Sequence, residues 1–444
     1  MNRPAANRPA VNRPAVNRPA VNRPAVNRHA VNRHAPITVL GTGTGGPPPT
    51  VGDATLVVGA ARHLAAARIP PRAERLTLGP LAPALAAMTR HLAEAEAPRV
   101  AVLASGDPGF FGVVRALAER FGPDALDVRP SVPAVAVAFA RIGLPWDDAA
   151  VVSAHGRDPA TALHVCRAHP KTAVLTGPGA GPAEIGAALA ASGLPRTLVV
   201  ATALGDPERE RLTRLGPAEA AARTWPDTGH VVLCLHPERA LAPAPGTLAG
   251  RVPADGWSGW ALPEDAFDHR ASLITKPEVR ALVLARLGPR LGDLVWDVGA
   301  GSGSVAVECA RLGAAAVAVE RSAEDAARCR ANATAHGVDV QVVHGTAPAA
   351  LRELPDPDAA FVGGGGAALP AVVTATARRA RRGVVVTLAA LDRVPAVRAA
   401  LSGAGLTPDG VLLQASRLAP LPGDVTRLAA ANPVFVLWGS RPTP

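Results

Sequence analysis

Residues 294–304, Leu-Val-Trp-Asp-Val-Gly-Ala-Gly-Ser-Gly-Ser, constrain the fold of this chain more than any other segment. The apolar start predicts a buried strand, the glycines predict a sharp turn, and the residues after Ser304 predict a helix. Glycines at 299, 301 and 303 let the backbone approach a ligand that any Cβ would block. Glu320 ends the next apolar run, where an acid in such a fold typically hydrogen-bonds ribose hydroxyls. The segment therefore predicts an α/β domain with a ligand site at the carboxyl ends of its strands.

The glycine spacing distinguishes between cofactors. A dinucleotide fingerprint needs G-x-G-x-x-G, but here the third glycine comes one place early, at Gly303 instead of position 304. With Asp297 upstream, the G-x-G-x-G turn resembles motif I of class I S-adenosylmethionine (SAM) methyltransferases. The alternative is a glycine-rich loop that has only a structural role.

The net charge of +10 at first suggests a nucleic-acid partner, but its location weakens that interpretation. Residues 1–35 hold seven arginines and no acid, in a five-residue Asn-Arg-Pro-Ala-Val repeat. Proline at this frequency blocks a helix, and the repeat has too little apolar surface for a core. We expect a disordered tail, and a basic arm that binds nucleic acid or anionic lipid remains the alternative.

The cysteines and the hydrophobic runs indicate the cell compartment and argue against membrane helices, disulfides and a metal site. No apolar run approaches the roughly 20 residues that a membrane helix needs. The four cysteines contain no Cys-x-x-Cys pair, which favours a reducing cytoplasm and argues against a disulfide framework. His164, Cys166 and His169 are spaced so that one helix would place them on different faces, so we expect no metal site.

Several strands before residue 240 end in polar, glycine-bearing turns and alternate with helices. The turn at 41–46 is followed by three prolines, which excludes a Rossmann nucleotide-binding helix there. A buried strand ends in Ser-Gly-Asp-Pro at 105–108, and another precedes His-Gly-Arg at 155–157. This alternation predicts an α/β domain with its site at the strand ends.

Over residues 36–240 these pieces resemble the tetrapyrrole methylase family, in particular its branch that acts late on the corrin ring. The resemblance implies a fold of two subdomains with SAM in the cleft between them. Gly109 departs from the larger residue usual in the family. Asp107 and His155 are candidate acid–base groups, each with an ordinary turn role as the alternative, and Arg157 is a candidate for a substrate carboxylate. The implied cofactor contacts are Gly41, Gly43, Gly106, Asp107 and Pro108.

The proline-rich residues 241–261 predict a linker, and residues 262–444 a second domain with a seven-strand α/β sheet. The segments 274–280, 345–348, 361–366 and 432–433 together resemble the decarboxylating precorrin methyltransferases. Lys276, Arg280 and Arg417 are candidates for substrate carboxylates, with surface salt bridges as the alternative, and Lys276 is also a catalytic candidate. The SAM contacts implied here are Thr275, Gly299, Ala300, Gly301, Ser302, Gly303, Glu320, Thr346 and Ala347.

Both halves in one chain resemble a family of fused enzymes of cobalamin biosynthesis. The resemblance implies methylation of precorrin-6B (precorrin-6Y) at C-5 and C-15 and decarboxylation of the ring C acetate, giving precorrin-8. It further implies two SAM sites, one per domain, and a homo-oligomer, with the second domain acting at C-15. The alternatives are a SAM-dependent tRNA methyltransferase, against which the scarcity of aromatic residues speaks, and a non-catalytic tetrapyrrole-binding protein.

Overall fold

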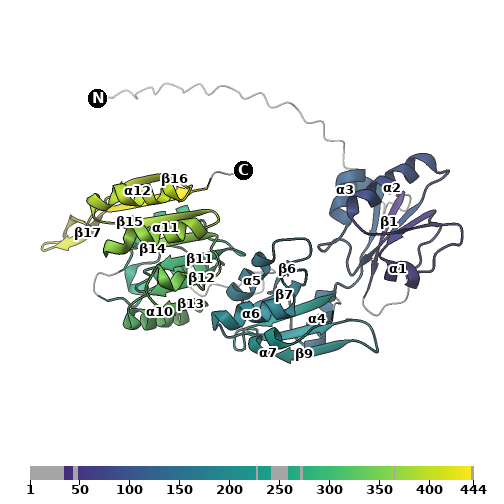
Figure 1. Cartoon of the computed structure of the whole chain (residues 1–444), viewed down its shortest axis with the longest axis horizontal. Coiled ribbons are helices and arrows are strands. Elements are labelled where there is room, and N and C mark those ends of the chain that lie inside the picture. The colour runs from purple at the N-terminus through teal and green to yellow at the C-terminus, as the bar shows by residue number, and fades with distance from the viewer. Residues whose placement is uncertain are drawn as a thin grey trace, which may run out of the picture.

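The computed structural model describes residues 35–43, 49–226, 229–241, 259–270, 274–364 and 366–441. Three α/β bodies lie in a row along the long axis of the molecule (Figure 1). The expected α/β class is confirmed, with two sheets before the proline-rich stretch and one large sheet after it. The repeat tail and most of the predicted linker lie outside the described residues. Within those ranges, no helix is both long enough and apolar enough to cross a bilayer.

The first sheet contains five parallel strands in the order β3-β2-β4-β1-β5. Its inner strands are nearly continuous apolar runs, as expected for parallel strands that helices cover on both faces. Ile37 and Val102 from the strands pack with Met88 and Leu117 from the covering helices, and all four are almost fully buried. The elements are β1 (Ile37–Thr42), β2 (Leu56–Gly59), α1 (Ala61–Ala66), β3 (Glu74–Thr77), α2 (Leu81–Glu94), β4 (Val100–Ser105), α3 (Val114–Phe121), η1 (Pro123–Ala125) and β5 (Leu126–Arg129).

The second sheet is mixed, in the order β6-β7-β10-β8-β9, with β6 and β7 parallel and the other neighbours antiparallel. Asp158 caps α5 by accepting a hydrogen bond from the Ala160 N–H at 3.0 Å. Gly186 allows α6 to lie against α7, because a Cβ there would meet the Ala221 nitrogen at 2.7 Å. The elements are α4 (Ala134–Ile142), β6 (Ala150–Ser153), α5 (Pro159–Ala168), β7 (Lys171–Leu175), α6 (Pro182–Ser192), β8 (Thr197–Thr202), β9 (Arg211–Leu215), α7 (Pro217–Ala222) and β10 (His230–Leu235).

The third sheet has the predicted seven strands, in the order β13-β12-β11-β14-β15-β19-β16. The first five are parallel, and β19 runs antiparallel to both of its neighbours. The elements are η2 (Glu264–Ala266), α8 (Pro277–Leu287), β11 (Leu294–Val298), α9 (Ser304–Arg311), β12 (Ala315–Glu320), α10 (Ala323–Ala335), β13 (Val340–His344), η3 (Ala349–Leu351), β14 (Ala359–Gly363), η4 (Gly366–Ala368), α11 (Leu369–Arg379), β15 (Gly383–Leu388), η5 (Leu391–Arg393), α12 (Val394–Gly403), β16 (Thr407–Leu413) and β19 (Val434–Ser440).

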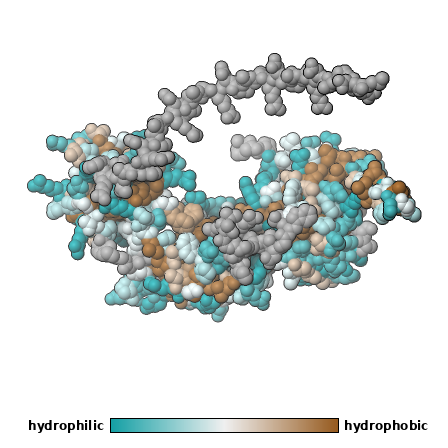
Figure 2. All heavy atoms as spheres, turned by 180° about the vertical axis from the view of Figure 1, so that it is seen from behind, coloured by the Kyte–Doolittle hydropathy of each residue, from teal (hydrophilic) through white to brown (hydrophobic). Residues whose placement is uncertain are grey.

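A two-stranded hairpin, β17 (Ser416–Leu421) and β18 (Val425–Ala430), projects from the third body (Figure 1). This hairpin is absent from the sequence-based prediction. Leu418 and Leu428 face each other across the two strands and are 79% and 68% exposed. In the space-filling view, hydrophobic residues lie among hydrophilic ones on the projecting hairpin (Figure 2).

The second body docks against the amino ends of strands in the third sheet (Figure 1). Asp339, directly before β13, pairs with Arg196 at 2.7 Å and also with Arg239. His164 on α5 donates from Nδ1 to the carbonyl oxygen of Gly292, 3.0 Å away and shortly before β11. Since ligands of such sheets bind at the carboxyl ends of the strands, this docking does not involve the predicted SAM edge.

Candidate functional site

The predicted strand, glycine turn and helix are all present at 294–311, as β11, the turn and α9. Gly299, Gly301 and Gly303 have φ values of 75°, 55° and 74°, which L side chains rarely adopt. A Cβ on Gly299 would lie 2.5 Å from the carbonyl oxygen of Gly363, and one on Gly303 would lie 2.2 Å from the Sγ of Cys329. The outer glycines therefore let the turn pack against β14 and α10.

Glu320 ends β12 and closes over this turn. Its Oε2 accepts a hydrogen bond from the Gly301 N–H, and its Oε1 accepts one from the Ser322 N–H, each at 2.9 Å. Its backbone carbonyl accepts from the Gly345 N–H at 2.8 Å, which brings the 345–347 segment to the same edge. Since a carboxylate oxygen can accept more than one hydrogen bond, Glu320 can also accept from ligand hydroxyls.

Asp297 lies beneath the turn, inside β11, and is 1% exposed. Its Oδ2 accepts from the Ala306 N–H at 2.9 Å, while its Oδ1 has no hydrogen-bond partner. Burial raises the pKa of Asp297 to about 7, the Ala306 hydrogen bond acts in the opposite direction, and the charge of Glu320 adds to the rise. The buried Ser302 hydroxyl also lacks a partner. These orphan polar groups, the glycine turn and Glu320 fit a ligand with a cationic end and a sugar.

Asp297 belongs to the predicted motif but is absent from the predicted site residues. An acidic residue in the middle of a fully buried strand was the signal that pointed to it. Asn332 on α10 was missed as well, and it donates to the carbonyl oxygens of Ser302 and Asp268 at 2.8 Å each. It thereby ties the glycine turn to the segment before α8.

The position of Arg280 contradicts the prediction that this residue binds a substrate carboxylate. It was a candidate for a substrate carboxylate, but it is completely buried, and its Nε donates to Glu308 Oε1 at 2.5 Å. Its other nitrogens donate to the carbonyl oxygens of Thr275 and Leu262. With all of its donors directed inward, Arg280 fixes the Thr275 segment to α9 and cannot reach a substrate.

Lys276 and Arg417, the other cations proposed for this domain, lie together around Glu264. Lys276 pairs with Glu264, and Arg417 reaches Glu264 at 2.5 Å and grips Glu278 in a fork of 2.8 and 2.7 Å. The hydrogen bonds to Glu278 and then Glu264 raise the pKa of Arg417. Both cations are thus partly exposed and already neutralised by glutamates.

In the first domain, the predicted glycines meet at the carboxyl ends of β1 and β4, next to the chain that leaves β5. A Cβ on Gly41 would lie 2.5 Å from the Gly106 carbonyl oxygen and 2.8 Å from the Cβ of Ser131. One on Gly43 would lie 2.3 Å from the Ser131 hydroxyl. The sequence does not point to Ser131, because this residue lies far from these glycines along the chain.

Loops from both subdomains meet beside these glycines. Phe110 follows the Ser-Gly-Asp-Pro turn and packs against the core of the second subdomain. The guanidinium of Arg157 lies 5.5 Å from the centre of the Phe111 ring. The 105–112 and 155–157 segments of the two subdomains therefore contact each other beside these glycines, and a SAM cleft between the subdomains stays a prediction.

The acid–base candidates of the first domain occupy turns. Asp107 accepts a hydrogen bond from the Gly109 N–H at 2.8 Å, which is the geometry of an Asx turn. His155 is exposed, and its backbone lies against Gly177, where a Cβ would meet the His155 Cα at 2.9 Å. The structure thus shows the turn role of Asp107, while an acid–base role of either residue stays a prediction.

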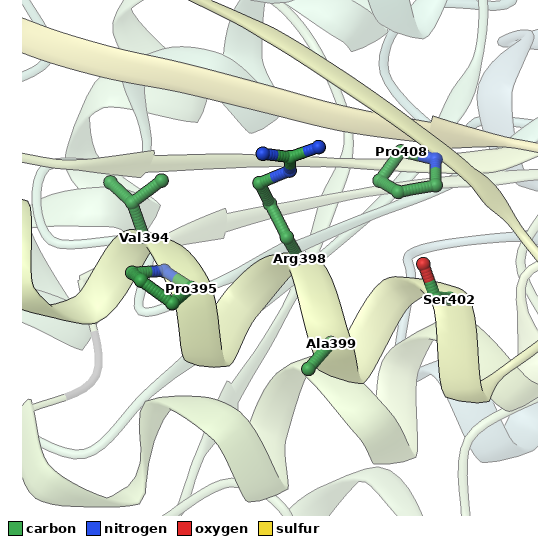
Figure 3. A pocket seen from close by; sticks show the side chains of 6 residues that line it. All are labelled: Val394, Pro395, Arg398, Ala399, Ser402 and Pro408. Atoms are coloured by element: carbon green, nitrogen blue, oxygen red, sulfur yellow. The ribbon is translucent and has the colours of Figure 1, made fainter.

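A separate hollow of about 340 Å³ lies on α12, next to the edge strand β16 (Figure 3). Its walls contain none of the predicted site residues. The residues that line it are Val394, Pro395, Arg398, Ala399, Ser402 and Pro408. We therefore assign it no part in the sites described above.

Comparison with known families assigns a family to each half of the chain. The family described as tetrapyrrole (corrin/porphyrin) methylases matches residues 49–221. The family described as the precorrin methyltransferase domain matches residues 265–438. The second range contains the whole glycine turn at 299–303, and the first contains Gly106 and Ser131 but begins after Gly41 and Gly43.

A relative from Sinorhizobium sp, named precorrin-6Y C(5,15)-methyltransferase [decarboxylating], is 38% identical over 328 residues. The match covers 71% of this chain and 73% of that protein. The chain belongs to this family. A family member from Mycobacterium tuberculosis is 35% identical over 320 residues, 70% of this chain and 74% of its own length. A shorter relative from Pyrobaculum calidifontis, named probable cobalt-precorrin-6B C(15)-methyltransferase (decarboxylating), is 36% identical over 183 residues, 40% of this chain and 93% of its own length.

Proposed function

We propose that this chain uses SAM to methylate precorrin-6B at C-5 and C-15, with decarboxylation of the ring C acetate, and that the product is precorrin-8. The observation that carries the proposal is the presence of two glycine-lined sites of unrelated architecture in one chain of this family. A single methylation at one position would not require both.

We assign the C-15 methylation and the decarboxylation to the second domain and the C-5 methylation to the first. The precorrin methyltransferase domain match falls entirely in the second domain. A relative of about the length of that domain carries both C(15) and decarboxylating in its name. These two observations support the assignment.

In the second domain, Glu320 and the glycine turn hold the ribose and the amino-acid part of SAM, with Thr275, Ala300, Ser302, Thr346 and Ala347 around them. Asp297 beneath the turn offers a free acceptor to the cationic end. When bound, SAM supplies an electrophilic methyl group on a positively charged sulfur. The meso carbons of the substrate ring are enamine-like nucleophiles, so the residues mainly have to align the reactants, an effect worth up to about 7–11 kcal/mol.

In the first domain, Gly41, Gly43, Gly106, Asp107 and Pro108 hold the second SAM. Gly41 lies close to the Gly106 carbonyl and to the Ser131 side chain, so a larger residue at position 41 would not fit there. Arg157, reaching from the other subdomain, faces the same cleft and offers a cation to a substrate carboxylate.

When the substrate binds to the second domain, its carboxylates replace Glu264 and Glu278 as the ion-pair partners of Lys276 and Arg417. The two cations are 33% and 42% exposed, so both remain accessible to a ligand from solvent. Lys276 also stays our catalytic candidate there, because it directly follows Thr275 in the proposed SAM site.

We also propose that the protein is a homo-oligomer in which the β17–β18 hairpin contacts a second copy. A two-stranded hairpin is marginal on its own in water, and this one exposes paired leucines. Light scattering of the wild type and of Leu418→Ser/Leu428→Ser tests this, and an unchanged mass would overturn it.

Four free, buried cysteines support a reducing compartment such as the cytoplasm.

The deciding experiment is a mass spectrum of precorrin-6B after incubation with the purified protein and SAM. We expect a gain of two methyl groups and a loss of one carbon dioxide. No change in mass despite intact SAM binding would refute the proposal and direct the search to another acceptor, first of all tRNA.

A further inference from the structure

Three polar side chains that the proposed sites have not used cluster at the carboxyl edge of the first sheet. Arg62 and His63 lie at the start of α1, and Ser105 ends β4. Arg62 Nη2 donates to Ser105 Oγ at 2.8 Å, and Arg62 Nε donates to His63 Nε2 at 3.3 Å. Ser105 Oγ lies 3.2 Å from the same His63 nitrogen. Each side chain thus contacts the other two.

The cluster borders the proposed SAM cleft of the first domain. Ser105 directly precedes Gly106, and it pairs in parallel register with Thr42, between Gly41 and Gly43. Both chain segments that build the glycine-lined wall therefore lie next to the Arg62 side chain and its partners.

The charge of the cluster resides on Arg62. His63 accepts at Nε2 from Arg62, and burial lowers the pKa of His63, with the Arg62 charge as the second cause. The imidazole is therefore neutral near pH 7. Arg62 is exposed, and in the described part of the chain no carboxylate pairs with it.

Other arginines of the protein are held differently. Arg417 is gripped by Glu264 and Glu278, and Arg141 by Glu210 at 2.6 Å. Arg62 instead is oriented by two neutral groups, which leaves its positive charge uncompensated beside a ligand cleft. A guanidinium fixed in this way is prepared to bind a carboxylate, because its fork of N–H groups matches the two oxygens.

We propose that Arg62 and the Ser105 hydroxyl bind a carboxylate group of a reactant in the first domain, and that His63 is a positioning residue for both. This inference rests on the proposed function. Two reactants carry the required group, namely the amino-acid end of SAM and the acidic side chains of the tetrapyrrole.

The test compares full-length Arg62→Gln, Arg62→Lys and Ser105→Ala with Arg75→Gln, an exposed arginine on β3 of the same sheet. We expect Arg62→Gln to raise the KM for the tetrapyrrole in the C-5 methylation, or to weaken SAM binding, at least about tenfold. Arg62→Lys should weaken binding less than Arg62→Gln does, because lysine keeps the positive charge but lacks the paired N–H groups of the guanidinium. SAM binding is measured in a Gly301→Asp background, so that the first site alone is observed.

His63→Ala should raise whichever constant Arg62→Gln raises, the tetrapyrrole KM or the SAM dissociation constant, and leave kcat unchanged. In the Arg62→Gln background, His63→Ala should cause no further change in that constant. An additive effect in the double variant would contradict the positioning role. A change in tetrapyrrole KM alone identifies the tetrapyrrole as the source of the carboxylate, and a change in SAM affinity identifies SAM.

Arg62→Gln behaving like Arg75→Gln in both assays would overturn the inference. This failure differs from that of the proposed function, because the wild type would still add two methyl groups. Retained C-15 methylation and decarboxylation in every variant that keeps Gly301 serves as the internal check that the chain is folded.

Discussion

The two proposed cofactor sites differ in how the chain builds them. In the second domain, one continuous segment supplies the strand, the glycine turn and the helix, and Glu320 from the next strand hydrogen-bonds to the turn. In the first domain, short segments from three strand ends and a loop of another subdomain come together. A contiguous site can be recognised from its spacing, whereas an assembled site depends on long-range packing that spacing does not reveal.

The largest expected effect comes from replacing a glycine of either proposed SAM site with aspartate. Gly301 has a φ of 55°, and its N–H donates a hydrogen bond to Glu320. Gly301→Asp therefore places a second carboxylate next to that of Glu320. Repulsion between the carboxylates should abolish SAM binding in the second domain and leave the first intact. Gly106→Asp should do the reverse. Calorimetry should give one bound SAM per chain for each variant and two for the wild type. Two in either variant would contradict the separation of the sites.

The domain interface should matter for stability but not for the chemistry. The Asp339 side chain is 8% exposed, and Asp339→Ala leaves the buried Arg196 without its carboxylate. Breaking a buried pair in this way costs about 3–5 kcal/mol, measured by urea unfolding. Because the interface lies at the amino ends of the strands, both methylations should persist at temperatures where the variant is folded. Loss of either methylation in the folded variant would show that the sites are coupled through the interface.

Removing the acid at the end of β12 should have a moderate effect. Glu320→Ala deletes an acceptor that serves the turn and, in our proposal, the ribose. Hydrogen bonds to charged groups contribute about 1.5–3 kcal/mol, so SAM affinity of that domain should fall about 10- to 100-fold. The matched control is Glu324→Ala on α10, which is exposed. Equal affinities for the two variants in calorimetry would remove Glu320 from the site.

The smallest expected effect is a pH dependence confined to the second domain. Burial raises the pKa of Asp297 to about 7 from the ordinary aspartate value of 3.8, so the folded chain retains this proton over a pH window in which the unfolded chain loses it. The stability that Asp297 contributes is therefore fully present below about pH 4 and is lost as the pH rises through about 7.

Asp297→Asn keeps the shape and removes the titration. The free energy of unfolding of the variant, relative to the wild type, should increase by at least about 1 kcal/mol between pH 4 and pH 8, since one pKa unit corresponds to about 1.36 kcal/mol. A constant difference across this range in chemical unfolding would contradict the raised pKa.

The sequence predicted the α/β class, the seven-strand sheet and the turn at 299–303, because each is encoded by local periodicity and glycine spacing. Arg280 was misjudged, since an arginine in a helical segment reads the same whether it faces solvent or Glu308, 28 residues further on. The contact of Asp339 with Arg196 spans 143 residues, which no local pattern reveals. The β17–β18 hairpin did have a turn signal in the Pro-Gly-Asp sequence at 422–424, although its strands lack a buried face.

The most direct test of two separate sites is the mass of the product that each site variant makes from precorrin-6B and SAM. We predict one added methyl group and the loss of one carbon dioxide for Gly106→Asp, and no decarboxylation for Gly301→Asp. A mixture of the two variants should restore the addition of two methyl groups. Identical products from both variants, or decarboxylation by Gly301→Asp, would contradict the account.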